Sequence, residues 1–166
     1  MPDASGDIVA NTYGEITRLV ERLHRRYLDV VRYELSKLEI DDINAVQALL
    51  MMNVQDSEVS IRELVDRGYY IGSNVTDNVR HLVDCGYLQQ NHTEQDRSSV
   101  RIFATEKGRE MCRSLRNMET HHAGTINVDP QDFCSTRDNL LGLERAWTDC
   151  IQSGHGEYAR RMMRKD

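Results

Sequence analysis

The sequence predicts a mainly helical, α+β fold in which long amphipathic helices flank a short hairpin of strands. Apolar residues recur every three or four positions from Tyr13 to Leu38. This spacing is typical of a single helical stripe. The apolar period then changes to two over residues 87–92 and 100–104, which indicates two strands. Helical signals return at Thr105 and continue toward the C-terminus.

Length and charge limit the class of protein. The chain has 166 residues and a formal net charge of −6, with 21 basic and 27 acidic residues. This length suits one domain with helical extensions. No run approaches the ~18–20 apolar residues of a membrane span, and the polar start does not resemble a secretory signal. We therefore expect a cytoplasmic protein that does not coat nucleic acid through bulk charge, so any anion-binding surface must be local.

Cap and stop signals divide the chain before the strands into three further helices. Asp41 is the expected N-cap of a helix over residues 42–53. Ser60-Ile61-Arg62-Glu63 has the capping-box spacing of a short helix that ends near Gly68. Another helix is expected from about Gly72 to Cys85, followed by Gly86 in a left-handed conformation. The inward positions of the first and last of these helices are Ile43, Val46, Leu49 and Leu50, and Val75, Val79 and Leu82.

Two helices are predicted after the strands, which are joined by a projecting polar tip over residues 93–99. Thr105 caps a helix whose inward residues are Met111, Leu115 and Met118, and residues 120–128 break it. Asp129 and Pro130 begin the last helix, which we expect to stop near Gly154 and Gly156.

A short helix followed by one that opens with small polar residues is typical of a DNA-binding helix-turn-helix. Short side chains opposite the Val75 stripe would let the helix backbone approach the major-groove floor. There Asn can pair with adenine and Asp can accept from cytosine. Arginine near a hairpin tip suits phosphate or a narrow minor groove. We therefore expect DNA contacts from Ser73, Asn74, Thr76, Asp77, Asn78, Arg80 and His81 of the helix and from Arg97, Ser98 and Arg101 of the hairpin, or wing.

Each of these assignments has a structural alternative. When the helix is considered alone, an ordinary solvated face explains Ser73, Asn74, Asp77 and Asn78 better than DNA contact does, and only its place between a capped short helix and a wing favours DNA. For Arg80 and His81, phosphate contact and plain exposure are equally open. Thr76 suits a phosphate contact or a local cap better than a base contact. Arg101 can instead pair with Glu94 or Asp96.

We expect no enzymatic activity, no cofactor and no metal. The sequence has no Gly-rich phosphate loop, no catalytic-triad pattern and no Cys-x-x-Cys among its 4 cysteines, which we expect to be free thiols. His81 and Cys85 are four residues apart on a helix. A nucleophilic pair also needs an orienting group and a pocket, so coincidental spacing is favoured.

The ordered set of motifs resembles the MarR family of bacterial transcription regulators. The resemblance is carried by Ser60–Leu64, Asn74–Val79, Leu82–Leu88, Asp96–Val100 and Ala104–Gly108. Residues 67–75, Arg-Gly-Tyr-Tyr-Ile-Gly-Ser-Asn-Val, resemble more narrowly an alphaproteobacterial, LdtR-like branch. One departure is Ser98, because the family's wing commonly has Asp-Arg-Arg. Arg97 must then provide the wing's charge alone or with Arg101.

The resemblance implies a winged helix-turn-helix with long N- and C-terminal dimerisation helices, acting as a homodimer on a pseudo-palindromic stretch of double-stranded DNA. It favours a repressor over an activator, associated with the nucleoid. The implied organisation is a flexible arm at 1–12, a dimerisation helix at 13–40, a winged DNA-binding domain at 41–111, dimerisation helices at 112–156 and a basic tail at 157–166.

Family members often bind a small aromatic or anionic effector between the dimerisation region and the winged domain. By this resemblance and by helical phase, His24, Tyr27, Tyr33 and Met51 would line such a site, with simple core packing as the alternative. A function of another class also stays open. A winged helix can bind protein instead of DNA, and the acidic net charge and the single wing-tip arginine favour that alternative.

Overall fold

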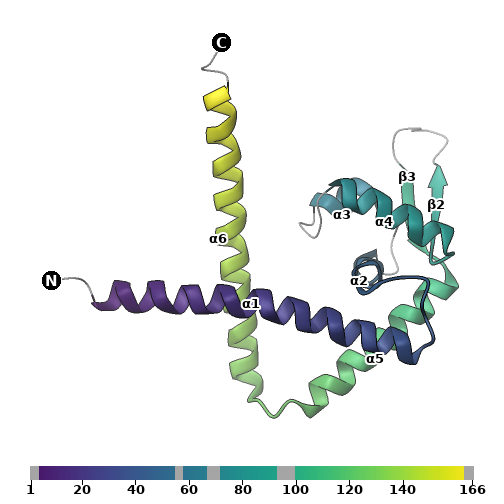
Figure 1. The fold of residues 1–166 in the computed structure, drawn as a ribbon, viewed down its shortest axis with the longest axis horizontal. Helices are drawn as coiled ribbons and strands as arrows, with labels where there is room; N and C mark the ends of the chain where they lie inside the picture. The colour runs from purple at the N-terminus through teal and green to yellow at the C-terminus, as the bar shows by residue number, and fades with distance from the viewer. Residues whose placement is uncertain (1–3, 55–57, 67–71, 93–99, 163–166) are drawn as a thin grey trace. The chain divides into compact units, whose positions relative to one another are not determined.

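The computed structural model describes residues 4–54, 58–66, 72–92 and 100–162 (Figure 1). The chain divides into two units, Met1–His121 and His122–Asp166. The described elements, in chain order, are α1 (Ala4–Lys37), α2 (Ala45–Val54), β1 (Val59–Ser60), α3 (Ile61–Asp66), α4 (Gly72–Asp84), β2 (Leu88–His92), β3 (Val100–Ala104), α5 (Glu106–Thr125) and α6 (Pro130–Met162).

The mainly helical fold class is confirmed, and the small sheet has one more described strand than the sequence predicted. Its order is β1-β3-β2, and both pairings are antiparallel. β3 pairs Arg101 with Ser60 on one side and with Asn91 on the other. β1 has two residues, which is too short for an alternating pattern to be visible in the sequence.

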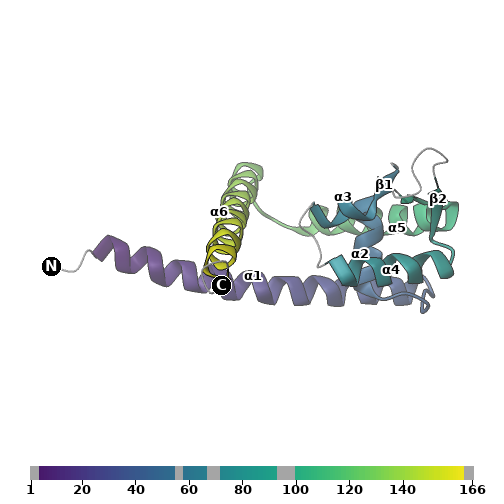
Figure 2. The same cartoon turned by 90° about the horizontal axis from the view of Figure 1, so that it is seen from above.

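The core lies between α2, α3, α4, the sheet, the first part of α5 and the C-terminal part of α1. In two perpendicular views these elements gather around that part of α1, whose N-terminal half extends beyond them (Figure 1 and Figure 2). The predicted inward stripe of α4 is confirmed, because Val75, Val79 and Leu82 are completely buried. The predicted inward residues of α5, namely Met111, Leu115 and Met118, are buried as well.

The start of α2 corrects the sequence-based prediction. The N-cap is Asn44 and not Asp41. The Asn44 side chain accepts a hydrogen bond from the Gln47 amide (3.0 Å), and the Gln47 side chain accepts one from the Asn44 amide (2.9 Å). This reciprocal arrangement is a capping box, and it was readable in the sequence as Asn-x-x-Gln. Val46, predicted to point inward, is 36% exposed.

Three helix boundaries also differ from the prediction. α1 begins at Ala4 and includes most of the expected arm at residues 1–12, with Asp7 in its first turn, where an acidic side chain is favourable. α5 continues to Thr125, so the break begins six residues later than predicted. α6 continues through Gly154 and Gly156 to Met162, because isolated glycines weaken a helix without ending it.

The predicted caps are otherwise confirmed. Gly86, after α4, has a φ of 78°. Thr105 accepts a hydrogen bond from the Gly108 amide (3.1 Å) at the start of α5. Asp129 accepts one from the Gln131 amide (2.8 Å) at the start of α6. No described helix is both long and apolar enough to cross a membrane.

Candidate nucleic-acid interface

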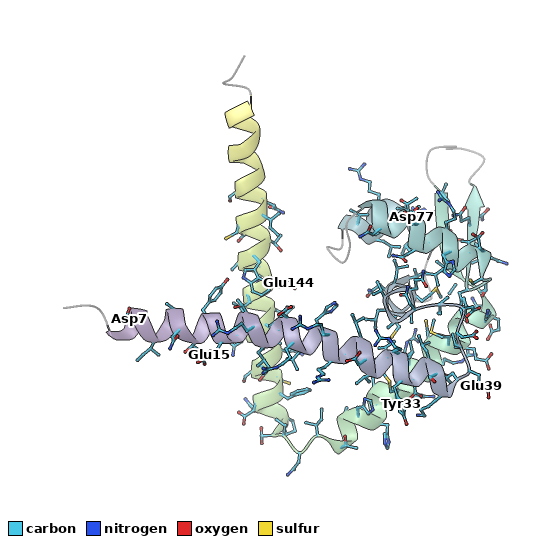
Figure 3. All side chains as sticks on the ribbon, in the orientation of Figure 1. Asp7, Glu15, Tyr33, Glu39, Asp77 and Glu144 are labelled. Atoms are coloured by element: carbon cyan, nitrogen blue, oxygen red, sulfur yellow. The ribbon has the colours of Figure 1, made fainter. Side chains whose placement is uncertain are left out.

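The exposed face of α4 lies opposite its buried stripe. Asn74, Asp77 and Arg80 are exposed on this face, and Asp77 is labelled in Figure 3. Arg80 lies 3.4 Å from the Asp77 carboxylate in an ion pair that is largely open to solvent. Such pairs contribute little to stability, so both side chains can exchange partners readily. Thr76 is half-buried, and Ser73 lies within α4, but its side chain is outside the described part of the structure.

Two of the predicted DNA contacts on α4 bond within the domain. The Asn78 side chain accepts a hydrogen bond from Gln47 Nε2 of α2 (3.1 Å) and donates one to the Asn74 carbonyl (2.8 Å). His81 Nε2 donates to the carbonyl of Asp42 (2.9 Å). The polar face of α4 therefore has two parts. Asn74, Asp77 and Arg80 are exposed, whereas Asn78 bonds to α2 and His81 bonds to the turn that precedes α2.

The wing is described only along its strands. Arg97 and Ser98, two of the predicted contacts, lie outside the described residues. Arg101 lies on β3, and its guanidinium is 3.0 Å from the Glu63 carboxylate. Its described partner is thus Glu63, and the predicted alternatives Glu94 and Asp96 lie outside the described residues.

Glu63 also completes the predicted capping box of α3. Its carboxylate accepts a hydrogen bond from the Ser60 amide (2.6 Å), and the Ser60 hydroxyl accepts one from the Glu63 amide (3.1 Å). Through Glu63, Arg101 joins the wing strand to the first turn of the helix-turn-helix. Its guanidinium is therefore shared with a structural partner.

A cluster that sequence reasoning missed fastens the C-terminal end of α4. We call it the Asp42 cluster, and it consists of Asp42, His81, Cys85, Tyr87 and Lys107. The Asp42 carbonyl accepts from His81 and from Cys85 Sγ (3.6 Å). The Asp42 carboxylate accepts from the Tyr87 hydroxyl (2.7 Å) and from Lys107 Nζ (2.9 Å). Within the cluster, Cys85 Sγ and His81 Nε2 lie 3.6 Å apart, as residues four positions apart on one helix face can.

The electrostatics of the cluster follow from these contacts. Burial raises the pKa of the Asp42 carboxyl, but the hydrogen bonds from Lys107 and Tyr87 outweigh it, so the net pKa is below its usual value. The hydrogen bond to Asp42 raises the pKa of Lys107. Burial, together with the hydrogen bond to Asp42, raises the pKa of Tyr87 to about 12. Near neutral pH the cluster is a carboxylate with one ammonium and one neutral phenol.

The predicted effector residues occupy different environments. Met51 is completely buried in the core, as the core-packing alternative expects, and Tyr27 packs against the core. Tyr27 also donates a hydrogen bond to Glu119, and burial and this bond raise its pKa well above the usual value. Tyr33, labelled in Figure 3, is 70% exposed, and His24 is exposed as well.

An open groove lies elsewhere, at the end of α1. Its volume is about 460 Å³, and its lining consists of Arg32, Leu35, Ser36, Glu39, Ile40, Asp41, Ile43, Asn44 and Ala45. None of the four predicted effector residues lines it. In the described part of the chain, no group of three or more His, Cys, Asp or Glu side chains could hold a metal ion.

Both long helices carry exposed apolar side chains. On α1 they are Ile8, Val9, Tyr13, Leu19 and Leu23, and on α6 they are Phe133, Leu140, Leu141 and Ile151. Each of these side chains is more than 40% exposed. Apolar area of this extent along a helix indicates a surface for another protein chain.

Comparisons with known proteins agree with this geometry. A family model described as a winged helix DNA-binding domain matches residues 43–108. The chain is 36% identical over 155 residues to the exopolysaccharide II synthesis transcriptional activator ExpG of Rhizobium meliloti, which covers 92% of this chain and 80% of ExpG.

Solved structures show the same fold at lower identity. FabT of Streptococcus pneumoniae, solved in complex with DNA, matches with a TM-score of 0.69 and 18% identity over 82% of this chain and 98% of FabT. A mutant of MarR from E. coli, solved with operator DNA, matches with a TM-score of 0.65 and 18% identity over 85% of this chain and 98% of MarR. These matches extend beyond the winged core to most of the chain. The protein thus belongs to the MarR family of winged helix-turn-helix proteins, which are transcriptional regulators and not enzymes.

Proposed function

We propose that this regulator binds a pseudo-palindromic site in double-stranded DNA as a homodimer, with α4 of each protomer in successive major grooves. The observation that carries the proposal is the construction of α4. Its apolar stripe is completely buried, while Asn74, Asp77 and Arg80 remain exposed on the opposite face. Side chains of these types can contact base edges or phosphates once the helix lies in the groove.

The test begins with selection of fragments from total genomic DNA by the full chain, followed by footprinting of the enriched fragments. We expect a protected site with two half-sites about one helical turn, ~34 Å, apart. Asn74→Ala should then weaken binding by about 5- to 150-fold, in keeping with the loss of one base contact. The matched control is Asn117→Ala, since Asn117 is exposed on α5. Equal affinities for the two variants would remove α4 from the interface.

The direction of regulation depends on where the operator lies. The family resemblance favours repression, which we propose for an operator that overlaps the promoter. The relative from R. meliloti is named as an activator, and activation would instead require an operator upstream of the promoter. A reporter fused to the selected promoter, with and without the regulator's gene, measures the sign directly. We propose that the protein acts in the cytoplasm at the nucleoid.

We also propose that a small aromatic or anionic effector shifts the dimer between geometries that match or miss the half-site spacing. Salicylate and benzoate are suitable probes, and operator affinity measured by fluorescence anisotropy is the readout. A lower operator affinity at millimolar probe supports the proposal. Unchanged affinity and an unchanged melting temperature contradict it for these two compounds.

The alternative is a protein-binding winged helix without DNA binding. The net charge of −6 favours it, and so does the partnering of Arg101 with Glu63. The fragment selection separates the two functions. A protein-binding module would enrich no fragment over a control without protein.

A further inference from the structure

We infer that Asp42, in the turn between α1 and α2, is a positioning residue that sets the orientation of α4 for DNA binding. It acts through the other members of the Asp42 cluster and is not itself a DNA contact. The inference rests on the proposed function, because it takes α4 to be the helix that enters the major groove.

The main chain of Asp42 holds the last turn of α4 from one side. Its carbonyl oxygen accepts hydrogen bonds from His81 Nε2 (2.9 Å) and Cys85 Sγ (3.6 Å). These residues are four positions apart, so both lie on the same face of the helix end. One backbone oxygen thus fixes the rotation of α4 about its axis relative to the end of α1. The same oxygen accepts the hydrogen bond of His81 Nε2, a residue that the sequence suggested as a DNA contact.

The side chain of Asp42 holds the same end through Lys107 and Tyr87. Lys107 Nζ bridges the Asp42 carboxylate (2.9 Å) and the carbonyl of Cys85 (2.9 Å), and it lies 3.9 Å from the centre of the Tyr87 ring. The Cys85 carbonyl directly follows α4, where helix carbonyls lack intrahelical partners and a cation is favourable. Asp42 therefore orients the ammonium that caps α4.

This arrangement should affect DNA binding more than folding. The side chains of Asp42 and Lys107 are 37% and 49% exposed, and ion pairs with this exposure contribute little to stability. Hydrogen bonds to base edges, in contrast, weaken steeply with small errors in distance and angle. A slight rotation of α4 would misplace Asn74 and Asp77 while leaving the buried stripe packed.

The neighbouring Asp41 provides a matched control. It lies in the same turn, is exposed, and carries the same charge as Asp42 without belonging to the Asp42 cluster. Asp42→Asn and Asp41→Asn therefore change the net charge equally, and only the first removes the carboxylate that orients Lys107.

The experiment measures operator affinity of the full chain by fluorescence anisotropy over a salt series, together with the melting temperature of each variant. We expect Asp42→Asn to weaken binding roughly tenfold and Asp41→Asn to leave it within about twofold of wild type. The slope of log affinity against log salt should stay the same in both, because no phosphate contact is lost. Asp42→Asn combined with Lys107→Met should be no weaker than either single variant, since the two residues act as one unit.

Several outcomes would overturn the inference. Wild-type affinity for Asp42→Asn at a temperature where it is folded, even with a lowered melting temperature, would show a purely structural role. Equal weakening by Asp41→Asn would show a general charge effect. Should Asp42→Asn fail to fold, Tyr87→Phe removes only the hydroxyl donor to the carboxylate, and unchanged binding by it would also overturn the inference. If wild type selects no DNA, the proposed function itself fails, and this inference fails with it.

Discussion

Gly108 lies in the first turn of α5, where that helix crosses the backbone of Tyr87. A Cβ at this position would lie 2.3 Å from the Tyr87 carbonyl oxygen and 2.6 Å from Met51 Cε. The Met51 side chain could move, but the Tyr87 backbone follows the end of α4 and precedes β2. The absence of a side chain at Gly108 therefore allows α5 to approach the winged core.

We predict that Gly108→Ala lowers the free energy of unfolding by about 1–3 kcal/mol, because the added methyl group overpacks a filled site. Urea denaturation monitored by circular dichroism measures the change. Gly124→Ala in the same helix is the control, since a Cβ there has no neighbour within 4 Å. That control should be neutral or stabilising by roughly 0.5–1 kcal/mol. Equal effects at the two positions would show that the close approach to Tyr87 is not maintained in solution.

The charge of Asp42 predicts a pH dependence of stability. The pKa of its carboxyl is below the usual value in the folded state, so the folded state favours the ionised form. The resulting stabilisation is present above the unfolded-state pKa of about 4 and is lost as the pH falls through the lower folded-state pKa. Wild type should therefore lose more stability between pH 6 and pH 2.5 than Asp42→Asn does. Urea midpoints at a series of pH values test this, and parallel curves for the two proteins would contradict it.

The wing and α3 are joined through Glu63, which bonds to both. Arg101 on β3 is paired with Glu63 in the capping box of α3, whereas Arg97 was predicted from the sequence to contact DNA near the wing tip. The two arginines should therefore contribute differently to phosphate binding, although they are only four residues apart.

We predict that Arg97→Ala weakens binding to all DNA sequences and reduces the salt slope by about one unit, as expected for the loss of one phosphate contact. Arg101→Ala should change the slope by less, because Glu63 already neutralises that guanidinium. Anisotropy titrations on the selected operator and on an unrelated duplex measure both slopes. An unchanged slope for Arg97→Ala would remove that residue from the interface.

Local patterns predicted the elements that local forces determine. The stripe of α4, the capping box at Ser60 and the left-handed Gly86 all follow from spacings within a few residues, and the structure confirms them. The early start of α1 was missed because its first turns carry little apolar periodicity. β1 was missed because two residues cannot alternate.

The candidate site was predictable only on its outer face. Asn74, Asp77 and Arg80 are exposed as helical phase requires. The inner contacts of Asn78 and His81 were not predicted, because their partners Gln47 and Asp42 are 31 and 39 residues away in the chain. Lys107 reaches Asp42 across 65 residues. No local sequence pattern predicts these long-range hydrogen bonds. They form only when the core has brought the α1–α2 turn, α4 and α5 together.

The long helices determine how the chain can assemble. α1 buries Val31 and Leu35 against the winged core, but Leu19 and Leu23 remain 41% and 55% exposed. α6 likewise leaves large apolar side chains exposed to solvent. A second copy of this chain would cover such surfaces, and homodimers generally bury extensive apolar interfaces of this kind. Dimerisation would also place two α4 helices on one duplex.

We predict that Leu19→Glu combined with Leu23→Glu converts the protein to a monomer and weakens operator binding by about 10²- to 10⁴-fold, because the second half-site then loses its effective concentration. Sedimentation velocity at micromolar concentration measures the assembly, and anisotropy measures the binding. Leu38→Glu is the control, since this leucine is 36% exposed just beyond α1, and it should remain dimeric. A double variant that becomes monomeric yet binds the full operator as wild type would show that one protomer is sufficient for binding. A wild-type protein that is itself a monomer would refute the assignment of these faces to a dimer.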